Sequence, residues 1–425
     1  MTRTLRGRLS AAVMMVAVAG TLLLGSPASA AAGVHAKIDA ALSACGMGGA
    51  GTSVAVYDLT AKRYLYSLRY DTLRLPASNE KLITSATALA DWTADYRFST
   101  QLFSDAAAPD DEGVLAGDVY LRGLGDPTLS TASYQDKRFG FETSDLRDFV
   151  TQLGALGVTK ITGRVVADEG YFDAERSVST WRPSVAAWCA PLSALTLNES
   201  VGSNGSYVHD PALWAAGKLT KMLRAADIRV VHAATGGVAP ATATLLCTEE
   251  SAELGRILAA MNKPSDNFLA EELLKGLGAG FGGKGSTEAG AEVAAEYLKS
   301  AGVTEGYRIR DGSGLSYRNK LSAHAVVKLL SVMAKRDDFK VYWKSLAVAG
   351  VSGTLKNRMR GTKAARNVHA KTGTLSAASC LSGYVTSANR HALVFSVLIN
   401  GSGLAISRAH AAQDRVAVIL ANAKP

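Results

Sequence analysis

Apolar and polar positions along the chain divide it into recognisable strands and helices. Two runs that alternate apolar and polar residues around a short polar link predict a β-hairpin: residues 52–59 and 63–70. Three β-rich runs with short links predict an antiparallel meander near the other end: residues 367–375, 381–387 and 392–400. Apolar residues three and four positions apart predict helices: from Ser78 to near Trp92, and over 289–301, 323–335 and 406–423. We therefore expect an α+β fold with a five-stranded antiparallel sheet, assembled from both ends of the chain and flanked by helices.

The pattern changes between residues 99 and 243. Strands are predicted there over 114–122, 160–167 and 229–233, and helices over 146–156 and 214–225. Two more helices, over 252–261 and 268–276, follow this segment. We interpret 99–243 as an inserted α+β domain within a discontinuous domain made of residues 31–98 and 244–425.

The first thirty residues are typical of an export signal. Arg3, Arg6 and Arg8 precede an apolar stretch over 11–24, and Ala28-Ser29-Ala30 is a small-x-small cleavage site. An uncleaved anchor is the alternative reading, but the apolar stretch is short for a membrane span. No later segment is apolar enough to cross a bilayer, so we expect a protein that is soluble outside the cytoplasmic membrane.

Charge and metal-ligand spacing exclude two other classes of function. Without the three signal arginines the formal charge falls from +9 to +6, and the basic residues are dispersed, so nucleic acid is not an expected partner. None of the seven histidines or four cysteines has metal-site spacing, and we expect no metal or cofactor. In an exported chain the cysteines allow two disulfides in three connectivities: Cys45, Cys189, Cys247 and Cys380.

Candidate chemistry begins with Ser78 and Lys81, three residues apart at the start of a helix. That spacing places both side chains on one face, within hydrogen-bond reach. A lysine held away from water has a lowered pKa, so it can take the proton of the serine and make it a nucleophile. On its own the pair is better explained by a capping serine followed by a solvated lysine.

Two downstream motifs change that balance: Ser265-Asp266-Asn267 between two helices, and Lys371-Thr372-Gly373-Thr374 on a strand of the meander. Acyl transfer from an amide needs a proton for the leaving amine, and Ser265 beside a second lysine suits that relay. Asn267 offers an amide that can bond the substrate or orient Lys81. The three motifs therefore predict one acyl-transfer site.

The Lys371 strand supplies the groups expected to hold a substrate. Lys371 offers a positive charge for a carboxylate, and the hydroxyls of Thr372 and Thr374 can donate to it. Gly373 lets an extended peptide approach the strand closely. The backbone N–H groups of Thr374 and Ser78 are candidates for an oxyanion hole. We interpret His369, on the same strand face as Lys371, as a rim residue rather than a base.

The order Ser-x-x-Lys, Ser-Asp-Asn, Lys-Thr-Gly is that of class A β-lactamases and penicillin-binding proteins. Over nearly its whole mature length the chain resembles class C low-molecular-mass penicillin-binding proteins, the D-alanyl-D-alanine carboxypeptidase/endopeptidase family of serine peptidases. Besides the three motifs, the resemblance rests on these segments: Pro76-Ala77-Ser78-Asn79, Gly125-Asp126-Pro127-Thr128-Leu129, Ala190-Pro191-Leu192-Ser193-Ala194-Leu195, Met261-Asn262-Lys263, Asp311-Gly312-Ser313-Gly314-Leu315-Ser316 and Gly353-Thr354-Leu355. The large separation of Ser78 from Ser265 also fits this family, since its members carry their extra domains between these two motifs.

The resemblance implies a penicillin-binding transpeptidase-like fold and a secreted, cell-wall-associated hydrolase. Its substrates would be peptidoglycan stem peptides ending in D-Ala-D-Ala, cleaved through an acyl-enzyme on Ser78, and β-lactams would trap the same serine. Two departures bear on specificity. Tyr317 stands before Arg318 where the family usually has an arginine directly after Gly-Leu-Ser, and the insertion is short around residues 200–210.

Two other functions remain open. A β-lactamase of class A would need a glutamate to activate the deacylating water, and no Glu-x-x-Leu-Asn segment occurs, because Ala194 lies four residues before Asn198. A catalytically silent wall-binding protein is the second alternative, although every motif residue is intact.

Overall fold

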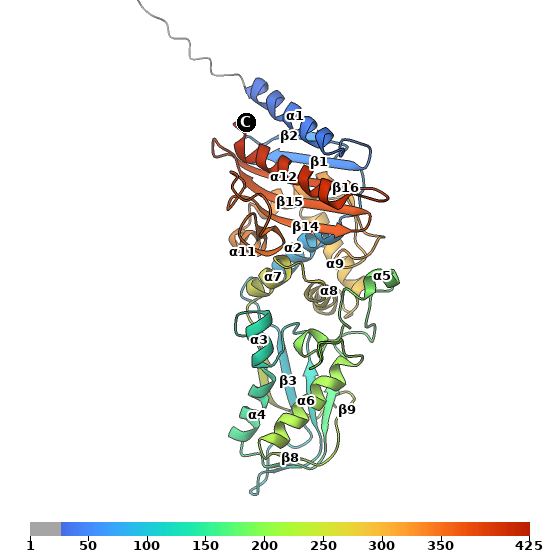
Figure 1. Cartoon of the computed structure of the whole chain (residues 1–425). Helices are drawn as coiled ribbons and strands as arrows, with labels where there is room; N and C mark the ends of the chain where they lie inside the picture. The colour runs from blue at the N-terminus through green and yellow to red at the C-terminus, as the bar shows by residue number, and fades with distance from the viewer. Residues whose placement is uncertain (1–26) are drawn as a thin grey trace, which may run out of the picture.

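The computed structural model describes residues 27–425 (Figure 1). Most of the predicted signal peptide, residues 1–30, lies outside this range, and its predicted cleavage site falls within α1 (Pro27–Ala44). No helix in the described range is long and apolar enough to span a bilayer. Figure 1 shows an elongated molecule with a large helix-covered sheet at one end and a smaller sheet at the other.

The larger sheet is antiparallel and joins segments from both ends of the chain. Its strands, in spatial order, are β13 (Ala347–Val348), β14 (His369–Leu375), β15 (Ala378–Thr386), β16 (Ala392–Asn400), β1 (Thr52–Asp58) and β2 (Arg63–Leu68). The five predicted strands are all present, and the two-residue β13 adds a sixth. Since β13 pairs only with His369 and Ala370, the outer edge of β14 from Lys371 onward has no strand partner among the described residues.

Both faces of this sheet are apolar, and helices cover both. On β1, Val54 and Val56 pack in one cluster with residues of α1 and α12 (Ile406–Asn422), whereas Ala55 packs in the opposite cluster with residues of α2 (Lys81–Asp91). This alternation follows from the two-residue period of a strand. Every residue of α2 from Lys81 to Leu89 is buried, so α2 is a core helix.

Further helices and short elements complete the second layer around α2. They are η1 (Ala77–Glu80), α7 (Leu254–Asn262), α8 (Asn267–Phe281), α9 (Thr287–Ser300), β11 (Tyr307–Arg308), β12 (Lys320–Leu321), α10 (Ala323–Met333), α11 (Phe339–Ser345) and η3 (Gly353–Leu355). α2 contacts α8 and α9, and α10 packs on β1, β15 and β16. This layer and β14 therefore enclose the start of α2.

The smaller tier holds a five-stranded sheet, a three-stranded parallel sheet and their helices. The first has the order β10 (Thr244–Glu250), β3 (Ser99–Ser104), β5 (Val119–Gly123), β7 (Val165–Asp168) and β9 (Thr235–Gly236). The second has the order β4 (Val114–Leu115), β6 (Lys160–Ile161) and β8 (Arg229–Val230). The helical elements are α3 (Ala132–Arg138), α4 (Leu146–Ala155), η2 (Asn198–Ser200) and α6 (Pro211–Ala225), whereas α5 (Pro183–Ala186) packs its Val185 into the core around α2. Residues 201–210 form a turn that leads directly into α6.

Three details of this tier differ from the sequence-based expectation. The predicted strands over 114–122 and 160–167 are each split in two, because Gly117 has φ +90° and a Cβ on Gly163 would lie 2.4 Å from the Gly117 carbonyl oxygen. β10 pairs with β3, so this sheet includes a segment that was assigned to the surrounding domain. Conversely, Val185 and Cys189, which were assigned to the inserted domain, pack in the core around α2.

The structure contains none of the disulfides that the four cysteines would allow. Cys45, Cys189, Cys247 and Cys380 are all buried and all free. They are distributed over three separate apolar clusters, with Cys189 and Cys380 in the cluster around α2. Free cysteine behaves in such places as a small apolar residue, which accounts for its position here.

Candidate active site

Ser78 and Lys81 lie at the junction of η1 and α2, beneath β14. The Lys81 ammonium nitrogen is 3.2 Å from the Ser78 hydroxyl oxygen, as their spacing predicted. Ser78 is partly exposed, whereas Lys81 is fully buried. Ala77 has φ +46°, an unusual value for a residue with a side chain, and this backbone kink directly precedes Ser78. The hydroxyl therefore faces solvent with the amine just behind it.

Lys81 has two further partners, both acceptors. Its Nζ lies 2.8 Å from Asn267 Oδ1 and 2.7 Å from the Ser313 carbonyl oxygen. Burial lowers the pKa of Lys81 to about 8, although the carboxylates of Asp266, Glu271 and Asp311 act in the opposite direction. A neutral amine has two N–H donors and one lone pair, so these acceptors can take the donors and leave the lone pair for Ser78.

Ser265 and Lys371 form a second serine–lysine pair. Lys371 Nζ lies 2.8 Å from Ser265 Oγ, and Lys371 is fully buried. Burial, reinforced by the charge of Lys81, holds the pKa of Lys371 well below its usual value. Ser265 has φ +69°, so the hydroxyl is presented by a left-handed backbone conformation. The two pairs lie next to each other, since Asn79, the residue after Ser78, donates its Nδ2 to the Lys371 carbonyl oxygen at 3.1 Å.

Asn267 connects the helices around α2 to the inserted segment. Its Oδ1 accepts from Lys81, and its Nδ2 donates to the Trp188 carbonyl oxygen at 2.9 Å. The side-chain amide is thereby fixed in orientation. Of the two roles expected for Asn267, orienting Lys81 is the one this geometry supports.

β14 brings its substrate-binding candidates against η1. Thr372 Oγ1 is 2.7 Å from Thr354 Oγ1, and the Thr374 side chain is exposed. A Cβ on Gly373 would lie 2.8 Å from the Pro76 carbonyl oxygen and 3.0 Å from the Ser78 nitrogen. Only glycine therefore allows β14 to pass so close to Ser78.

His369 is buried rather than at the rim, so that expectation is wrong. Its ring stacks on Trp343 with centroids 3.5 Å apart and an interplanar angle of 18°. Burial lowers the pKa of His369 to about 4. The imidazole is therefore neutral at physiological pH, and its place in the stack is structural.

Glu271 and Asp311 shape the site, and sequence reasoning gave neither a role. Glu271 accepts from the backbone N–H groups of Gly312 and Ser313, at 3.1 and 2.7 Å. Asp311 accepts from Gly314 N–H at 2.8 Å. These bonds fix the loop whose Ser313 carbonyl contacts Lys81. The Asp-Gly-Ser-Gly segment was the only signal in the sequence for this support.

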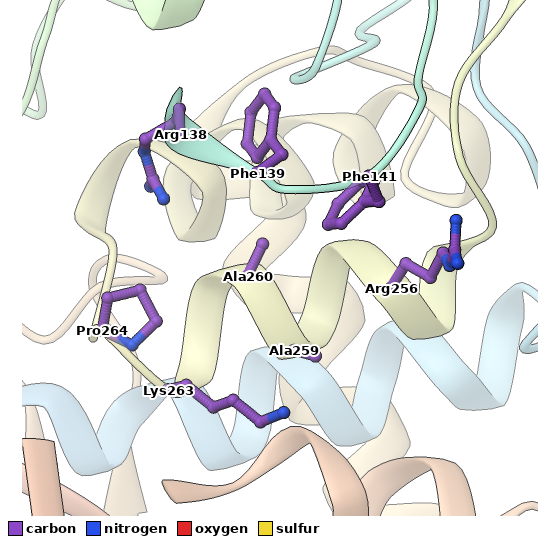
Figure 2. A pocket seen from close by; sticks show the side chains of 8 residues that line it. All are labelled: Arg138, Phe139, Phe141, Arg256, Ala259, Ala260, Lys263 and Pro264. Atoms are coloured by element: carbon purple, nitrogen blue, oxygen red, sulfur yellow. The ribbon is translucent and has the colours of Figure 1, made fainter. Parts of the chain in front are cut away.

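Arg138, on α3 of the inserted segment, holds the Ser265 loop from outside. Its Nε is 2.8 Å from Glu199 Oε2, and its terminal nitrogen contacts Asp266 Oδ2. Asp266 Oδ1 in turn accepts from Leu269 N–H at 2.8 Å and caps α8. Burial raises the pKa of Glu199 to about 7. Figure 2 shows that Arg138 and Pro264, the residue that precedes Ser265, line the same pocket.

The arrangement involves no metal site in the described residues, where no three or more His, Cys, Asp or Glu side chains gather to hold an ion. All eight predicted site residues lie on three segments that meet at Ser78: η1 with α2, the loop before α8 with the first residue of α8, and β14. Chemically, the site offers a hydroxyl beside an amine of lowered pKa, and a second hydroxyl beside a second such amine.

Comparisons with known proteins identify relatives of this chain in sequence and in fold. The profile of the D-Ala-D-Ala carboxypeptidase 3 (S13) family matches residues 34–206 and 203–423. The D-alanyl-D-alanine carboxypeptidase of Actinomadura sp. (strain R39) is 33% identical over 97% of this chain and 90% of its own. Penicillin-binding protein 4 (dacB) of Haemophilus influenzae has the same fold, with a TM-score of 0.74 at 20% identity over 89% of this chain and 97% of its own. The same protein with a bound novel β-lactam gives a TM-score of 0.69 at 21% identity over 89% of this chain and 98% of its own.

Proposed function

We propose that this chain, a serine D-Ala-D-Ala carboxypeptidase that belongs to the D-Ala-D-Ala carboxypeptidase 3 (S13) family, cleaves peptidoglycan stem peptides through an acyl-enzyme on Ser78. The observation that carries the proposal is the presence of two serine–lysine pairs in one site, Ser78 with Lys81, which Asn267 holds, and Ser265 with Lys371.

In the first step, the Ser78 oxygen attacks the carbonyl carbon of the penultimate D-alanine. Lys81, in its neutral form, takes the hydroxyl proton across the 3.2 Å contact. Asn267 and the Ser313 carbonyl keep the amine aimed at Ser78. The tetrahedral oxyanion is bound by backbone N–H groups, for which those of Ser78 and Thr374 remain our candidates.

In the second step, the bond between this carbonyl carbon and the leaving amine breaks. The amine needs a proton, and Ser265 can donate its own while Lys371 replaces it across their 2.8 Å contact. The substrate carboxylate would lie near Lys371, Thr372 and Thr374. Burial disfavours the charge on Lys371 in the free protein, and an arriving carboxylate would restore the charged form because opposite charges attract strongly away from water. Water then hydrolyses the ester and frees Ser78.

β-Lactams would act as substrate mimics that acylate Ser78. A strained lactam presents a reactive amide to the same nucleophile, and its ester then hydrolyses slowly. The likeness to a penicillin-binding protein solved with a β-lactam supports this expectation. Thr372 and Thr374 would bind the lactam carboxylate as they bind that of the peptide.

The proposed substrate requires a location outside the cytoplasmic membrane. Arg3, Arg6, Arg8 and the apolar stretch that follows them support export, with cleavage after residue 30. We therefore propose a secreted enzyme that works at the cell wall. The domain limits belong to the same proposal. The inserted domain covers residues 99–243, and its sheet continues into β10, which pairs with β3.

The test is to measure release of D-alanine from a soluble pentapeptide ending in D-Ala-D-Ala, alongside hydrolysis of nitrocefin. We expect D-alanine release that is lost in Ser78→Ala and retained in Ser206→Ala, which removes an exposed serine of a surface turn. Fast nitrocefin hydrolysis without D-alanine would indicate a β-lactamase instead. Neither activity in the wild-type protein would favour the silent wall-binding alternative.

A further inference from the structure

A pocket of about 520 Å³ lies across the large sheet from the catalytic serine. β14, which passes beside Ser78, is near one edge of this sheet, and β2 forms the other edge (Figure 1). The pocket lies beside β2, between the β1–β2 hairpin, α10 and the C-terminal end of α9. Its apolar floor includes Leu59, Val327 and Val332. None of the proposed catalytic or substrate-binding residues lines it, so the proposed reaction gives this pocket no role.

Aromatic rings form the hairpin side of the pocket. Tyr57 on β1 and Tyr64 on β2 are cross-strand partners, and their rings meet edge to face with centroids 5.1 Å apart. Tyr64 also meets the His324 ring of α10 edge to face, and it stays 38% exposed. Burial raises the pKa of Tyr64 to about 12, so its phenol is neutral at physiological pH and can donate a hydrogen bond. Fixed rings of this kind pack against the C–H faces of sugars, while the phenol hydroxyl bonds sugar hydroxyls.

The charge around the pocket is positive and unopposed. Lys62, Lys328 and Lys335 line it, and no Asp or Glu does. None of these three lysines has a carboxylate within 4.0 Å in the part of the chain that the structure describes. Asp71 lies outside the walls and is paired with His324 at 2.6 Å. The charge of this pocket therefore favours an anionic ligand.

The kind and spacing of the cations favour phosphate groups on a polymer. Lysine offers a compact point charge that suits phosphate, whereas bidentate recognition of a carboxylate favours the arginine fork, and no arginine lines the pocket. Lys328 lies on α10, and Lys335 follows seven positions later, just past the end of that helix. Seven residues of helix rise about 10 Å. Cations spaced in this way suit successive phosphates of a polymer better than one isolated phosphate.

We propose that this pocket binds a phosphate-bearing sugar polymer, with a sugar ring against Tyr57 and Tyr64 and phosphates at Lys328 and Lys335. The inference rests on the proposed location outside the cytoplasmic membrane, but not on catalysis by Ser78. Because the pocket and Ser78 lie toward opposite edges of the sheet, the protein can hold the polymer and cleave a peptide at the same time. The pocket thus tethers the enzyme to an anionic surface and does not select its substrate.

The experiment measures binding of the purified protein to four polymers of similar length: a glucosylated poly(glycerol phosphate), the same polymer without glucose, polygalacturonate and poly(L-glutamate). We expect the lowest Kd for the glucosylated phosphate polymer. Lys328→Gln/Lys335→Gln should raise that Kd at least about tenfold at low salt. Tyr64→Ala, an independent change to the pocket, should raise it about fivefold and leave the Kd of the polymer without glucose within about twofold of wild type.

Two control variants accompany this measurement. Lys340→Gln/Lys344→Gln removes the same two charges from exposed positions of α11 and should bind like the wild type. Ser78→Ala should bind like the wild type as well, because the pocket takes no part in the reaction. Urea unfolding of every variant confirms that the fold is kept.

Other outcomes overturn the inference in distinguishable ways. An equal loss in the pocket and control lysine variants would mean general attraction to a basic protein. Tighter binding of polygalacturonate or of poly(L-glutamate), lost in the same pocket variant, would assign the pocket to a carboxylated glycan or to an acidic protein segment. Binding of no polymer by the folded wild-type protein would leave the pocket without this role. Polymer binding without any D-alanine release would instead overturn the proposed function alone.

Discussion

The Arg138 contacts give a prediction whose magnitude can be worked from the structure. Arg138→Gln removes the cation shared by Glu199 and Asp266, whose side chains are only 8% and 18% exposed. Two hydrogen bonds between charged groups contribute about 1.5–3 kcal/mol each. Arg138 is itself 23% exposed, so solvent screening reduces that sum. We expect the free energy of unfolding to fall by about 3 kcal/mol at pH 8.

The same change should depend on pH with a defined sign. Burial already raises the pKa of Glu199 to about 7, and Arg138 opposes this shift. Without the guanidinium the pKa of Glu199 rises further. The folded variant therefore keeps the Glu199 carboxyl protonated at a pH where the unfolded chain, with the ordinary pKa of about 4.5, has lost that proton. Stability of the variant should therefore decrease as pH rises from 6 to 9, and the difference from wild type should grow.

Function should respond as well, because Arg138 acts on the Ser265 loop through Asp266. We expect the rate constant for acylation by a fluorescent penicillin to fall about tenfold, and Arg138→Lys to restore part of it, since lysine keeps the charge but cannot bridge both carboxylates as a planar fork. Urea unfolding and acylation kinetics provide the two measurements. Normal acylation in a destabilised Arg138→Gln protein would show that the contact is structural only, and unchanged stability would refute the energetic reasoning.

Three further predictions concern the site itself. Lys81 must be neutral to act as a base, and its pKa is lowered to about 8. The rate of acylation should therefore rise about tenfold per pH unit from pH 6 to 7 and level off above pH 8. A rate that does not change with pH would exclude Lys81 as the base. Gly373→Ala should slow acylation at least about a hundredfold, because the added Cβ would lie 2.8 Å from the Pro76 carbonyl oxygen, and a rate near wild type would contradict the close approach. Arg182 stacks on the Tyr317 ring at 3.9 Å. Tyr317→Ala should therefore raise KM for a stem peptide about fivefold, the equivalent of about 1 kcal/mol, while the rate of penicillin acylation stays within twofold of wild type. A loss in kcat alone would rule out a contact that sets specificity.

The sequence predicted the site better than its surroundings, and the reason is physical. Ser78 and Lys81 are neighbours on one helical turn, so their contact follows from local geometry alone. Ser265 and Lys371 could be assigned to the same site because each belongs to a short motif, in which particular residue types occur at a fixed spacing. The meander strands were equally accessible, since their apolar periodicity is long enough to detect.

Tertiary contacts account for what the sequence did not reveal. The Trp188 carbonyl that holds Asn267 is a backbone group, which carries no residue-specific signal. The contact of Arg138 with Glu199 joins residues 61 positions apart, and Glu199 itself has φ +52°, a conformation that no residue type there predicts. The two-residue β13 is too short to show a period. His369 was expected at the rim because nothing in the sequence placed Trp343 over its ring.

The central claim is that Ser78 is the nucleophile of an acyl-enzyme. Its most direct test is mass spectrometry of the protein after incubation with penicillin, with peptide mapping of the adduct. We predict one covalent penicilloyl group, located on the peptide that contains Ser78 and absent from Ser78→Ala. An adduct on another residue, or none in the folded wild-type protein, would contradict the assignment of Ser78.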